Sequence, residues 1–551
     1  MRPKGRGELD SLYFEYPHFD PPVRSAASGK EETPVLIVGA GPVGLVAALT
    51  LAEQGTKCIV IELKDTFNDG SRAICIARQS YYLLEKIGAI DAFLKKSLGW
   101  TMGRTFYRGQ QILEFEMPNG RDDKFLPMYN LEQQYIEQFL HEAASRSPLI
   151  DIRWQSELTG LTDTASGIVA KVQDPTGAYD IAAQWLLAAD GARSAVRSMR
   201  GLKLRGDNYE GRYVIADVRM NHDYPTIRRA LFDPACLPGG TVLIHRQPEN
   251  IWRIDYQLAP GESAEEATRE ETVRAKVSAI LREIGHEGPW ELEWWSIYSA
   301  NTLLLDDYRD GRIFFIGDSA HIVPIFGVRG LNNGIADAQN IGWKLALVLA
   351  GRAGPGLLKS YTPERRGATL DVFANATKST RFMTPPTRGW SLVRDAALSL
   401  ALDHDFARPF ANPRQMMPYT YADSPITAPD DPGFAAGPHP GMVAPDVALS
   451  DGTFLSDHVG NGFCCLCFAE PGRKTDDLLK TLSARHPDLR VIITGTTMTD
   501  PDGVMARRYG AQPGATYLIR PDLHVAARWT HADAEVIADA LARLLDLKEA
   551  L

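Results

Sequence analysis

Apolar residues form short runs that alternate with glycine-bearing turns and helical stretches in much of the chain. The runs Val35–Val38 and Cys58–Ile61 are short and predict strands. An alanine- and leucine-rich stretch between them, which ends at Gln54, predicts a helix. A third run, Arg312–Ile316, predicts a strand, followed by a loop and a helix that begins near Asn332. Strands that alternate with helices in this way indicate a parallel α/β sheet.

The remaining regions show other patterns. The polar residues 1–32 predict an N-terminal arm, in which Met1–Gly7 is expected to be loose and Tyr13–Pro17 to pack on the body or on a partner. The pattern further predicts strand-like runs in 106–125 and 209–297, a mostly helical segment at 361–415, a linker rich in proline, aspartate and glycine at 416–440, and a last α/β module at 441–551.

The first strand leads directly into a glycine-rich turn. Its residues are Gly39, Ala40, Gly41, Pro42, Val43 and Gly44, and Glu62 ends the next strand. Gly39 allows the tight turn, Gly41 lets a pyrophosphate approach, and Gly44 lets helix and strand pack closely, while the acid accepts from ribose hydroxyls. A glycine-rich turn in an ordinary α/β domain is the alternative. The context favours a Rossmann-like dinucleotide site.

Two more motifs follow apolar strands. Asp318, after Gly317, can accept hydrogen bonds from a polyol, and Gly330 allows close backbone approach to a planar ligand. The helix N-terminus just beyond favours negative charge. Asp190, in LLAADGARSAVR, again follows a strand, with Arg193 and Arg197 on the turn beyond. Together the motifs suit a flavin, which has a ribityl chain and a ring that becomes anionic when it is reduced.

In order and spacing, the three motifs resemble those of the FAD-dependent single-component aromatic hydroxylases typified by p-hydroxybenzoate hydroxylase, over residues 33–385. The run from His321 to Pro324 and the triplet Gly330-Leu331-Asn332 resemble that family's flavin loop closely. Many members carry a second proline where this chain has Ile325, whose carbonyl is expected to face the substrate. The chain is most similar to the longer hydroxylases that act on 3-(3-hydroxyphenyl)propionate and phenol, whose C-terminal domain is thioredoxin-like; residues 516–529 resemble the end of that domain.

The resemblance implies an α/β and α+β fold. An FAD-binding domain (33–105, 126–208 and 298–360) is interleaved with an antiparallel-sheet substrate domain (106–125 and 209–297), and a thioredoxin-like domain without redox function follows at 441–551. It also implies non-covalent FAD, transient NADH or NADPH, O₂, a flavin hydroperoxide, a phenolic substrate and a homodimer. Gln133 and Arg72 match residues beside the cofactor in relatives. For Gln133, a solvated helix position is an equal alternative.

The sequence gives fewer signals for the residues of the substrate pocket. His245 and Tyr256 are the best candidates for accepting a phenol proton, ahead of Arg246 and Arg253. Side chains alternate along a strand, so about half of these point elsewhere, and each is more often structural. Ile325 completes the predicted catalytic set.

Several other functions share some of these sequence features. Cys464 and Cys467 form a C-x-x-C, but within the apolar run Phe463–Phe468, which predicts a buried strand rather than a redox pair. His321 has no partner at metal-ligand spacing, so no metal is expected. The same flavin chemistry on a polyketide or heteroaromatic substrate, an FAD reductase or oxidase, a halogenase, and a flavin-loaded scaffold remain alternatives.

Length, composition and net charge narrow the possible classes of protein further. The chain of 551 residues suits two to four domains, and 44% hydrophobic residues allow large cores. The net charge of −10 argues against nucleic acid and anionic membranes as partners. Neither a membrane-spanning run nor an export signal is expected, and the six cysteines do not form a disulfide framework. A cytoplasmic enzyme is predicted.

Overall fold

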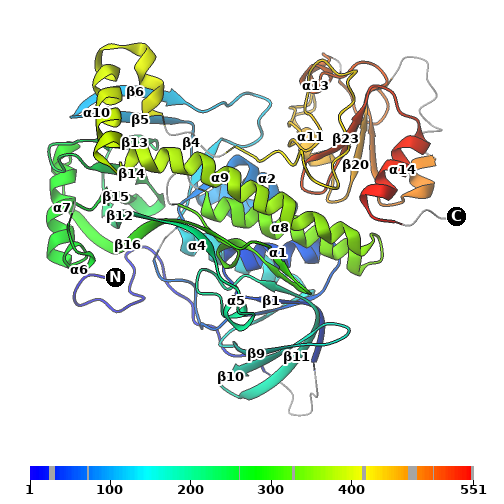
Figure 1. Cartoon of the computed structure of the whole chain (residues 1–551), viewed down its shortest axis with the longest axis horizontal. Coiled ribbons are helices and arrows are strands. Elements are labelled where there is room, and N and C mark those ends of the chain that lie inside the picture. The colour runs from blue at the N-terminus through cyan, green and yellow to red at the C-terminus, as the bar shows by residue number, and fades with distance from the viewer. Residues whose placement is uncertain are drawn as a thin grey trace.

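A computed structural model describes residues 1–23, 31–70, 73–259, 261–324, 329–412, 417–469, 481–500 and 502–547. Figure 1 shows two sheet domains joined by long helices, with a smaller C-terminal unit packed beside them. None of the helices in the described ranges has the length and apolar character needed to cross a membrane.

The first sheet carries the predicted nucleotide-binding strands. Its order is β17-β18-β11-β1-β2-β8, and the pairs from β18 to β8 are parallel. Its strands are β1 (Glu31–Val38), β2 (Cys58–Ile61), β8 (Ile150–Arg153), β9 (Glu157–Asp163), β10 (Ile168–Asp174), β11 (Gly177–Ala188), β17 (Arg309–Asp310) and β18 (Ile313–Phe315). The predicted parallel α/β sheet is confirmed, and β9 and β10 extend it through β11.

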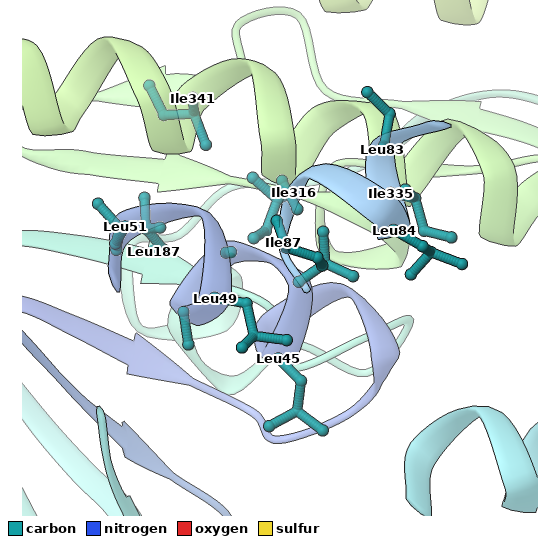
Figure 2. Close-up of a cluster of buried hydrophobic side chains, with 14 of the residues drawn as sticks. Leu45, Leu49, Leu51, Leu83, Leu84, Ile87, Leu187, Ile316, Ile335 and Ile341 are labelled. Atoms are coloured by element: carbon teal, nitrogen blue, oxygen red, sulfur yellow. The ribbon is translucent and has the colours of Figure 1, made fainter. Parts of the chain in front are cut away.

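Three helices pack together beside this sheet: α1 (Pro42–Glu53), α4 (Gln133–Ser145) and α8 (Gly330–Leu349). A Cβ atom on Gly342 would lie 2.7 Å from Thr50 Cγ2, so glycine lets α8 lie close against α1. Figure 2 shows the apolar side chains between these elements, including Leu45 and Leu49 of α1 and Ile335 of α8. The flavin motifs therefore extend from a rigid core.

The second sheet has the order β19-β16-β12-β15-β14-β13-β5-β6. Its strands are β5 (Met102–Tyr107), β6 (Gln110–Glu116), β12 (Arg205–Met220), β13 (Arg228–Phe232), β14 (Thr241–Arg246), β15 (Ile251–Gln257), β16 (Trp290–Leu304) and β19 (His321–Ile322). All pairs are antiparallel except β13 with β5. β12 begins at Arg205, four residues before the predicted region 209–297, because Arg205–Asn208 pair with β16 despite their polar sequence.

The remaining elements before the C-terminal unit lie outside the two large sheets. They are β3 (Cys75–Ala77), β4 (Leu98–Trp100), β7 (Met128–Asn130), α2 (Arg78–Lys86), α3 (Ile90–Lys96), α5 (Ala195–Met199), α6 (Ala264–Ala267), α7 (Glu270–Glu283), α9 (Tyr361–Met383), α10 (Arg388–Asp403) and the 3₁₀ turns η1 (Pro248–Asn250), η2 (Gly317–Ser319), η3 (Pro355–Ser360) and η4 (Asp405–Ala411). β3, β7 and β4 form a small antiparallel sheet. The long helices α9 and α10 agree with the helical pattern at 361–415.

The C-terminal unit is built on a four-stranded sheet of order β21-β20-β22-β23. Its elements are α11 (Leu455–His458), β20 (Cys464–Cys467), β21 (Arg490–Ile493), α13 (Val504–Tyr509), β22 (Thr516–Ile519), β23 (Val525–Trp529) and α14 (Ala534–Leu544). β20 and β21 are parallel, and the other pairs are antiparallel. The predicted strand around Cys464–Cys467 is confirmed, whereas the thioredoxin-like assignment stays a prediction.

The prediction that Met1–Gly7 is loose is wrong. The Arg2 side chain is only 3% exposed and forms ion pairs with Asp69, at 2.7 Å, and with Glu293. The terminal ammonium of Met1 donates to the Trp295 carbonyl at 2.8 Å. Contacts with Glu293 and with the Trp295 carbonyl, 291 and 294 positions away, anchor a segment whose own sequence is polar.

Candidate functional site

The glycine-rich turn lies at the carboxyl end of β1. Gly39 has φ +107°, and a Cβ atom there would lie 2.5 Å from the Ala189 carbonyl oxygen. A Cβ on Gly44 would lie 1.9 Å from the Gly39 oxygen. By contrast, a Cβ on Gly41 would meet no atom within 4 Å. Open space at Gly41, directly before Pro42 at the start of α1, fits an anion bound at the helix N-terminus.

Glu62 closes this turn from the neighbouring strand. Its carboxylate accepts from the backbone N–H of Ala40, at 2.9 Å, and from that of Lys64, at 3.1 Å. The acid is therefore held beside the pyrophosphate cradle, where the dinucleotide fingerprint requires a ribose acceptor. This arrangement fits the adenosine half of FAD.

The other two motifs meet this turn. Ser319 Oγ, in the 3₁₀ turn after β18, donates to the Ala188 carbonyl at 2.6 Å, and Ala188 ends the strand before Asp190. Val43 lies against Gly317 and Gly334, whose Cβ atoms would fall 3.1 and 2.6 Å from its Cγ2 atom. The three motifs, separated by more than 270 residues, thus converge at one edge of the parallel sheet.

The acidic members of these motifs differ in environment. Asp318 is exposed, as an acceptor for a ligand must be. Asp190 Oδ2 accepts from the Val196 N–H at 3.0 Å, whereas its buried Oδ1 has no hydrogen-bond partner among the described residues. Burial raises the pKa of Asp190. Asp190 Oδ1 can therefore accept from a bound polyol or ribose, and the exposed position of Asp318 makes its carboxylate accessible to one.

Helix α8 begins at Gly330, two residues before the predicted Asn332. The Asn332 side chain accepts from Ala77 N, at 2.8 Å, and from Ser80 Oγ, at 2.7 Å, and it donates to the Cys75 carbonyl at 3.1 Å. It therefore fixes β3 and α2 to the first turn of α8. This leaves the backbone N–H groups of that turn as the feature that favours an anionic ring.

A buried charge cluster behind Asp318 was missed by the sequence analysis. Asp337 of α8 accepts from Gly317 N at 3.0 Å, contacts His321 Nε2 at 2.6 Å, and pairs with Arg365 Nε of α9 at 2.6 Å. Burial alone would raise the pKa of Asp337, but Arg365 and His321 outweigh it and hold that pKa below its usual value. The carboxylate thus positions the Gly317-Asp318 turn.

A second buried cluster joins the C-terminal unit to the same helices. Glu364 of α9 pairs with Lys344 of α8, at 2.6 Å, and with Arg520 Nη1, at 2.7 Å, and Arg520 also pairs with Asp522 at 2.6 Å. Burial opposes ionisation of Glu364, yet Arg520 and Lys344 lower its pKa to about 2. The C-terminal unit is therefore fixed to the helix whose N-terminus faces the predicted flavin.

The structure describes only some of the other predicted cofactor residues. Gln133 accepts from Ala73 N at 3.3 Å and donates to Glu137 at 2.8 Å. Arg72 and Ile325 lie outside the described residues. Leu331 is partly buried against the main core. The predicted cofactor contacts of Gln133 and Leu331 stay predictions.

The two predicted proton acceptors lie on opposite faces of the antiparallel sheet. Tyr256 belongs to the apolar cluster that includes α7. His245 lies on the other face, with its ring centroid 6.3 Å from that of Trp100. Burial, reinforced by Arg228 and Arg253, lowers the pKa of His245 to about 3. His245 is therefore neutral near pH 7 and suits hydrogen bonding better than proton uptake.

Asp255 shares the sheet face of His245 and was not predicted. It is 6% exposed, and its Oδ1 atom has no hydrogen-bond partner among the described residues. Burial raises the pKa of Asp255 to about 7, although Arg253 lowers it in part. A carboxyl with this pKa exchanges protons near neutral pH, as a general base must. Only its tertiary surroundings distinguish it from any other strand aspartate.

No group of three or more histidine, cysteine, aspartate or glutamate side chains in the described ranges is arranged to hold a metal ion. The cysteines at 58, 75, 236, 464, 465 and 467 are all free thiols. Burial raises the pKa of Cys464 to about 12, which disfavours the reactive thiolate.

Comparison with known proteins agrees with this geometry. Residues 32–376 match the family model described as FAD binding domain. A 3-(3-hydroxy-phenyl)propionate/3-hydroxycinnamic acid hydroxylase of Mycobacterium sp. (strain JLS) is 27% identical over 540 residues, covering 94% of this chain and 93% of the relative. A 6-methylpretetramide 4-monooxygenase of Streptomyces rimosus is 29% identical over 539 residues, covering 94% of each chain.

Solved structures share the fold. The flavin-dependent monooxygenase PieE, in complex with FAD and substrate, superimposes with a TM-score of 0.80 at 23% identity, over 95% of this chain and 100% of that one. Aklavinone-11 hydroxylase, with FAD and aklavinone, gives a TM-score of 0.76 at 24% identity, over 94% and 100%. The chain belongs to the FAD binding domain family, and its predicted membership of the FAD-dependent aromatic hydroxylases is confirmed.

Proposed function

We propose that this protein is an NAD(P)H- and O₂-dependent monooxygenase that hydroxylates a phenolic ring. The observation that carries the proposal is the convergence of three flavin motifs at one sheet edge, beside the polar face of an antiparallel sheet. Relatives named as hydroxylases of 3-(3-hydroxyphenyl)propionate, similar over 94% of this chain, support a phenolic substrate.

The residues around the glycine-rich turn fit FAD. Gly41 and the N-terminus of α1 would hold the pyrophosphate, Glu62 the adenosine ribose, and Asp318 the ribityl chain. When bound, FAD supplies the redox chemistry, accepting electrons from a nicotinamide cofactor and passing one oxygen atom of O₂ to the substrate. The first turn of α8 would stabilise negative charge on the reduced ring.

The chain's own contribution to the ring chemistry is proton transfer and orientation. A phenolate is a better nucleophile than a phenol, so a group that takes the phenol proton accelerates attack on an electrophilic oxygen. Asp255, with a pKa of about 7, is the proposed acceptor. His245, the sequence candidate, is proposed to orient the ring hydroxyl as a neutral hydrogen-bonding group.

The nicotinamide cofactor, the oligomeric state, the cellular location and the role of Ile325 are proposed from the resemblance to the aromatic hydroxylases. One dinucleotide fingerprint is present in the sequence, so NADH or NADPH is proposed to bind transiently over the flavin. A homodimer and a cytoplasmic setting are proposed, the latter in keeping with six free thiols. The Ile325 carbonyl is retained as a proposed substrate-facing group.

A polyketide substrate is the second candidate. It is favoured by the 29% identity to a 6-methylpretetramide 4-monooxygenase, which covers 94% of this chain. Both candidates use the same flavin chemistry and differ in the size of the ring system that the pocket must accept.

The test is NAD(P)H oxidation by the purified yellow protein with a panel of phenols, heteroaromatics and aromatic polyketides. We expect slow oxidation alone and faster oxidation with one class, together with formation of a hydroxylated product. If no compound raises the rate and peroxide accounts for every electron, the protein is an oxidase and the proposal fails.

A further inference from the structure

An arginine without an acidic partner is buried on the sheet face that carries His245 and Asp255. Arg228 begins β13 and is 7% exposed. Among the described residues, none pairs with its guanidinium or accepts a hydrogen bond from it. Burial lowers the pKa of Arg228 to about 10, so the group stays charged at neutral pH. A buried charge with no counter-ion is costly, which suggests that a ligand supplies one.

The residues beside Arg228 form a polar row that crosses the neighbouring strands β13, β14, β15 and β12. The pairing of Arg229 with Ile244 sets Arg228 next to His245, which in turn pairs with Arg253. Arg253 is already neutralised, since its Nε and Nη2 atoms each donate to an Asp217 carboxylate oxygen at 2.8 Å. Neither Asp217 nor Asp255 acts on the pKa of Arg228, so its positive charge is not compensated by a carboxylate of this row.

His245 adds a second hydrogen-bonding group. It is 6% exposed, and its Nδ1 atom has no hydrogen-bond partner among the described residues. The charges of Arg228 and Arg253 both lower the pKa of the His245 ring. The strand register places His245 between these two arginines. A neutral imidazole beside a cationic guanidinium can donate to the same anionic oxygen.

The row also faces the expected flavin site. The charges of Arg253, Arg228 and Asp255 all act on the thiol of Cys75, in β3. The Cys75 carbonyl accepts from Asn332 Nδ2, in the first turn of α8, at 3.1 Å. One short strand therefore separates Arg228 from that helix N-terminus. The pyrophosphate cradle at Gly41 belongs to the other sheet, so FAD phosphates do not explain Arg228.

We propose that Arg228, assisted by His245, forms a subsite for an anionic oxygen of the aromatic substrate. The oxygen belongs either to a carboxylate carried by the ring's side chain or to the ring phenolate itself. The inference rests on the proposed function, because it refines the substrate class of the same pocket. It favours acidic phenols over neutral polyketides, since a neutral ligand would leave Arg228 uncompensated.

Ligand binding to the FAD-loaded enzyme tests the subsite, with dissociation constants taken from calorimetry and from the flavin absorption spectrum. The probes are 3-(3-hydroxyphenyl)propionate, its methyl ester, and 3-phenylpropionate, which has no ring hydroxyl. The variants are Arg228→Met, Arg228→Lys to retain the charge, and Arg229→Met as the matched control. Arg229 lies over the Tyr224 ring, 4.4 Å from its centroid, instead of in the polar row.

For carboxylate binding, Arg228→Met should weaken both acids by about 10- to 100-fold, as expected for a lost charged hydrogen bond, and leave the ester unchanged. Arg228→Lys should recover part of the affinity, and Arg229→Met should lose none. For phenolate binding, the substitution should instead weaken the hydroxylated acid and the ester equally. Either result supports the subsite. Unchanged affinity for all three probes, or equal effects of Arg228→Met and Arg229→Met, overturns it.

Binding and turnover measurements distinguish a failure of the Arg228 subsite from a failure of the proposed enzyme activity. 3-Phenylpropionate has no phenol to hydroxylate, so its Arg228-dependent binding would stand even if no phenol were turned over. Conversely, turnover of phenols with no Arg228 dependence would refute only the subsite. Because Arg228→Met removes an uncompensated buried charge, FAD content should be preserved and the melting temperature should not fall. A marked fall would show that Arg228 has a structural partner, which contradicts the proposal.

Discussion

Replacing Arg365 with leucine should strongly destabilise the flavin domain. The guanidinium of Arg365 donates to Asp337 Oδ1 at 2.6 Å, to the Tyr421 hydroxyl at 2.7 Å and to the Asn333 carbonyl at 3.1 Å. The Asp337 side chain is completely buried. Without Arg365, the contacts that remain to this carboxylate within the described ranges are those with His321 and Gly317.

Breaking a buried ion pair from one side costs about 3–5 kcal/mol, a large part of the roughly 5–15 kcal/mol that stabilises a domain. At about 2–4 °C per kcal/mol, the melting temperature should fall by roughly 6–20 °C. Because Asp337 also holds Gly317 N–H, the displaced turn should release FAD. Thermal unfolding followed by flavin fluorescence and circular dichroism measures both effects.

Arg352→Leu is the matched control. Arg352 pairs with Asp488 at 2.8 Å, but the two side chains are 36% and 65% exposed. Such a surface pair contributes about 0–1 kcal/mol. The double variant Arg365→Leu/Asp337→Leu should recover part of the loss, because neither charge is then left alone. If Arg365→Leu melts within 2–3 °C of the control, roughly 1 kcal/mol, and retains FAD, the positioning role of this cluster is refuted.

Three further predictions concern the cofactor, the proton acceptor and the C-terminal unit. Asp318→Ala should lose most of its FAD, measured by absorption after gel filtration, while Asp306→Ala, on an exposed loop, should keep it; equal contents would remove Asp318 from the site. Asp255 has a pKa of about 7 in the folded enzyme and acts as a base when it is deprotonated, so the hydroxylation rate should rise with pH through that value. Asp255→Asn should remove this rise and slow turnover by about 10²–10⁴-fold. A pH profile that does not change in the variant would exclude Asp255 as the base. The double change of Cys464 and Cys467 to serine should leave the coupled hydroxylation rate intact, since the thiols are buried in β20, and loss of turnover with FAD retained would reveal a redox pair.

Local sequence signals predicted the strands and turns that are proposed to hold the cofactor. The glycines at 39, 41 and 44 and the apolar runs around them act over a few residues, so their spacing carries the information. The structure brings this turn together with Asp190 and Asp318, because the carboxyl ends of parallel strands share one sheet edge.

Features that depend on burial and distant pairing were not predictable in this way. Arg365 and Asp337 lie 28 residues apart on two helices, and Arg2 pairs with Glu293 across 291 residues. Asp255 has no distinguishing sequence context, because its altered pKa arises from desolvation in the folded sheet. Period-2 alternation could not by itself decide between the face of His245 and that of Tyr256, because the register had to be known first.

Oxygen transfer from ¹⁸O₂ tests directly whether this protein hydroxylates a phenolic ring with molecular oxygen. The FAD-loaded enzyme would be supplied with NAD(P)H, ¹⁸O₂ and the phenol that most accelerates NAD(P)H oxidation, and the product would be analysed by mass spectrometry. A monooxygenase gives a hydroxylated ring that carries one ¹⁸O atom, with product formed in proportion to NAD(P)H consumed. Unlabelled phenol recovered with all electrons in hydrogen peroxide, or a product whose new oxygen comes from water, would contradict this activity.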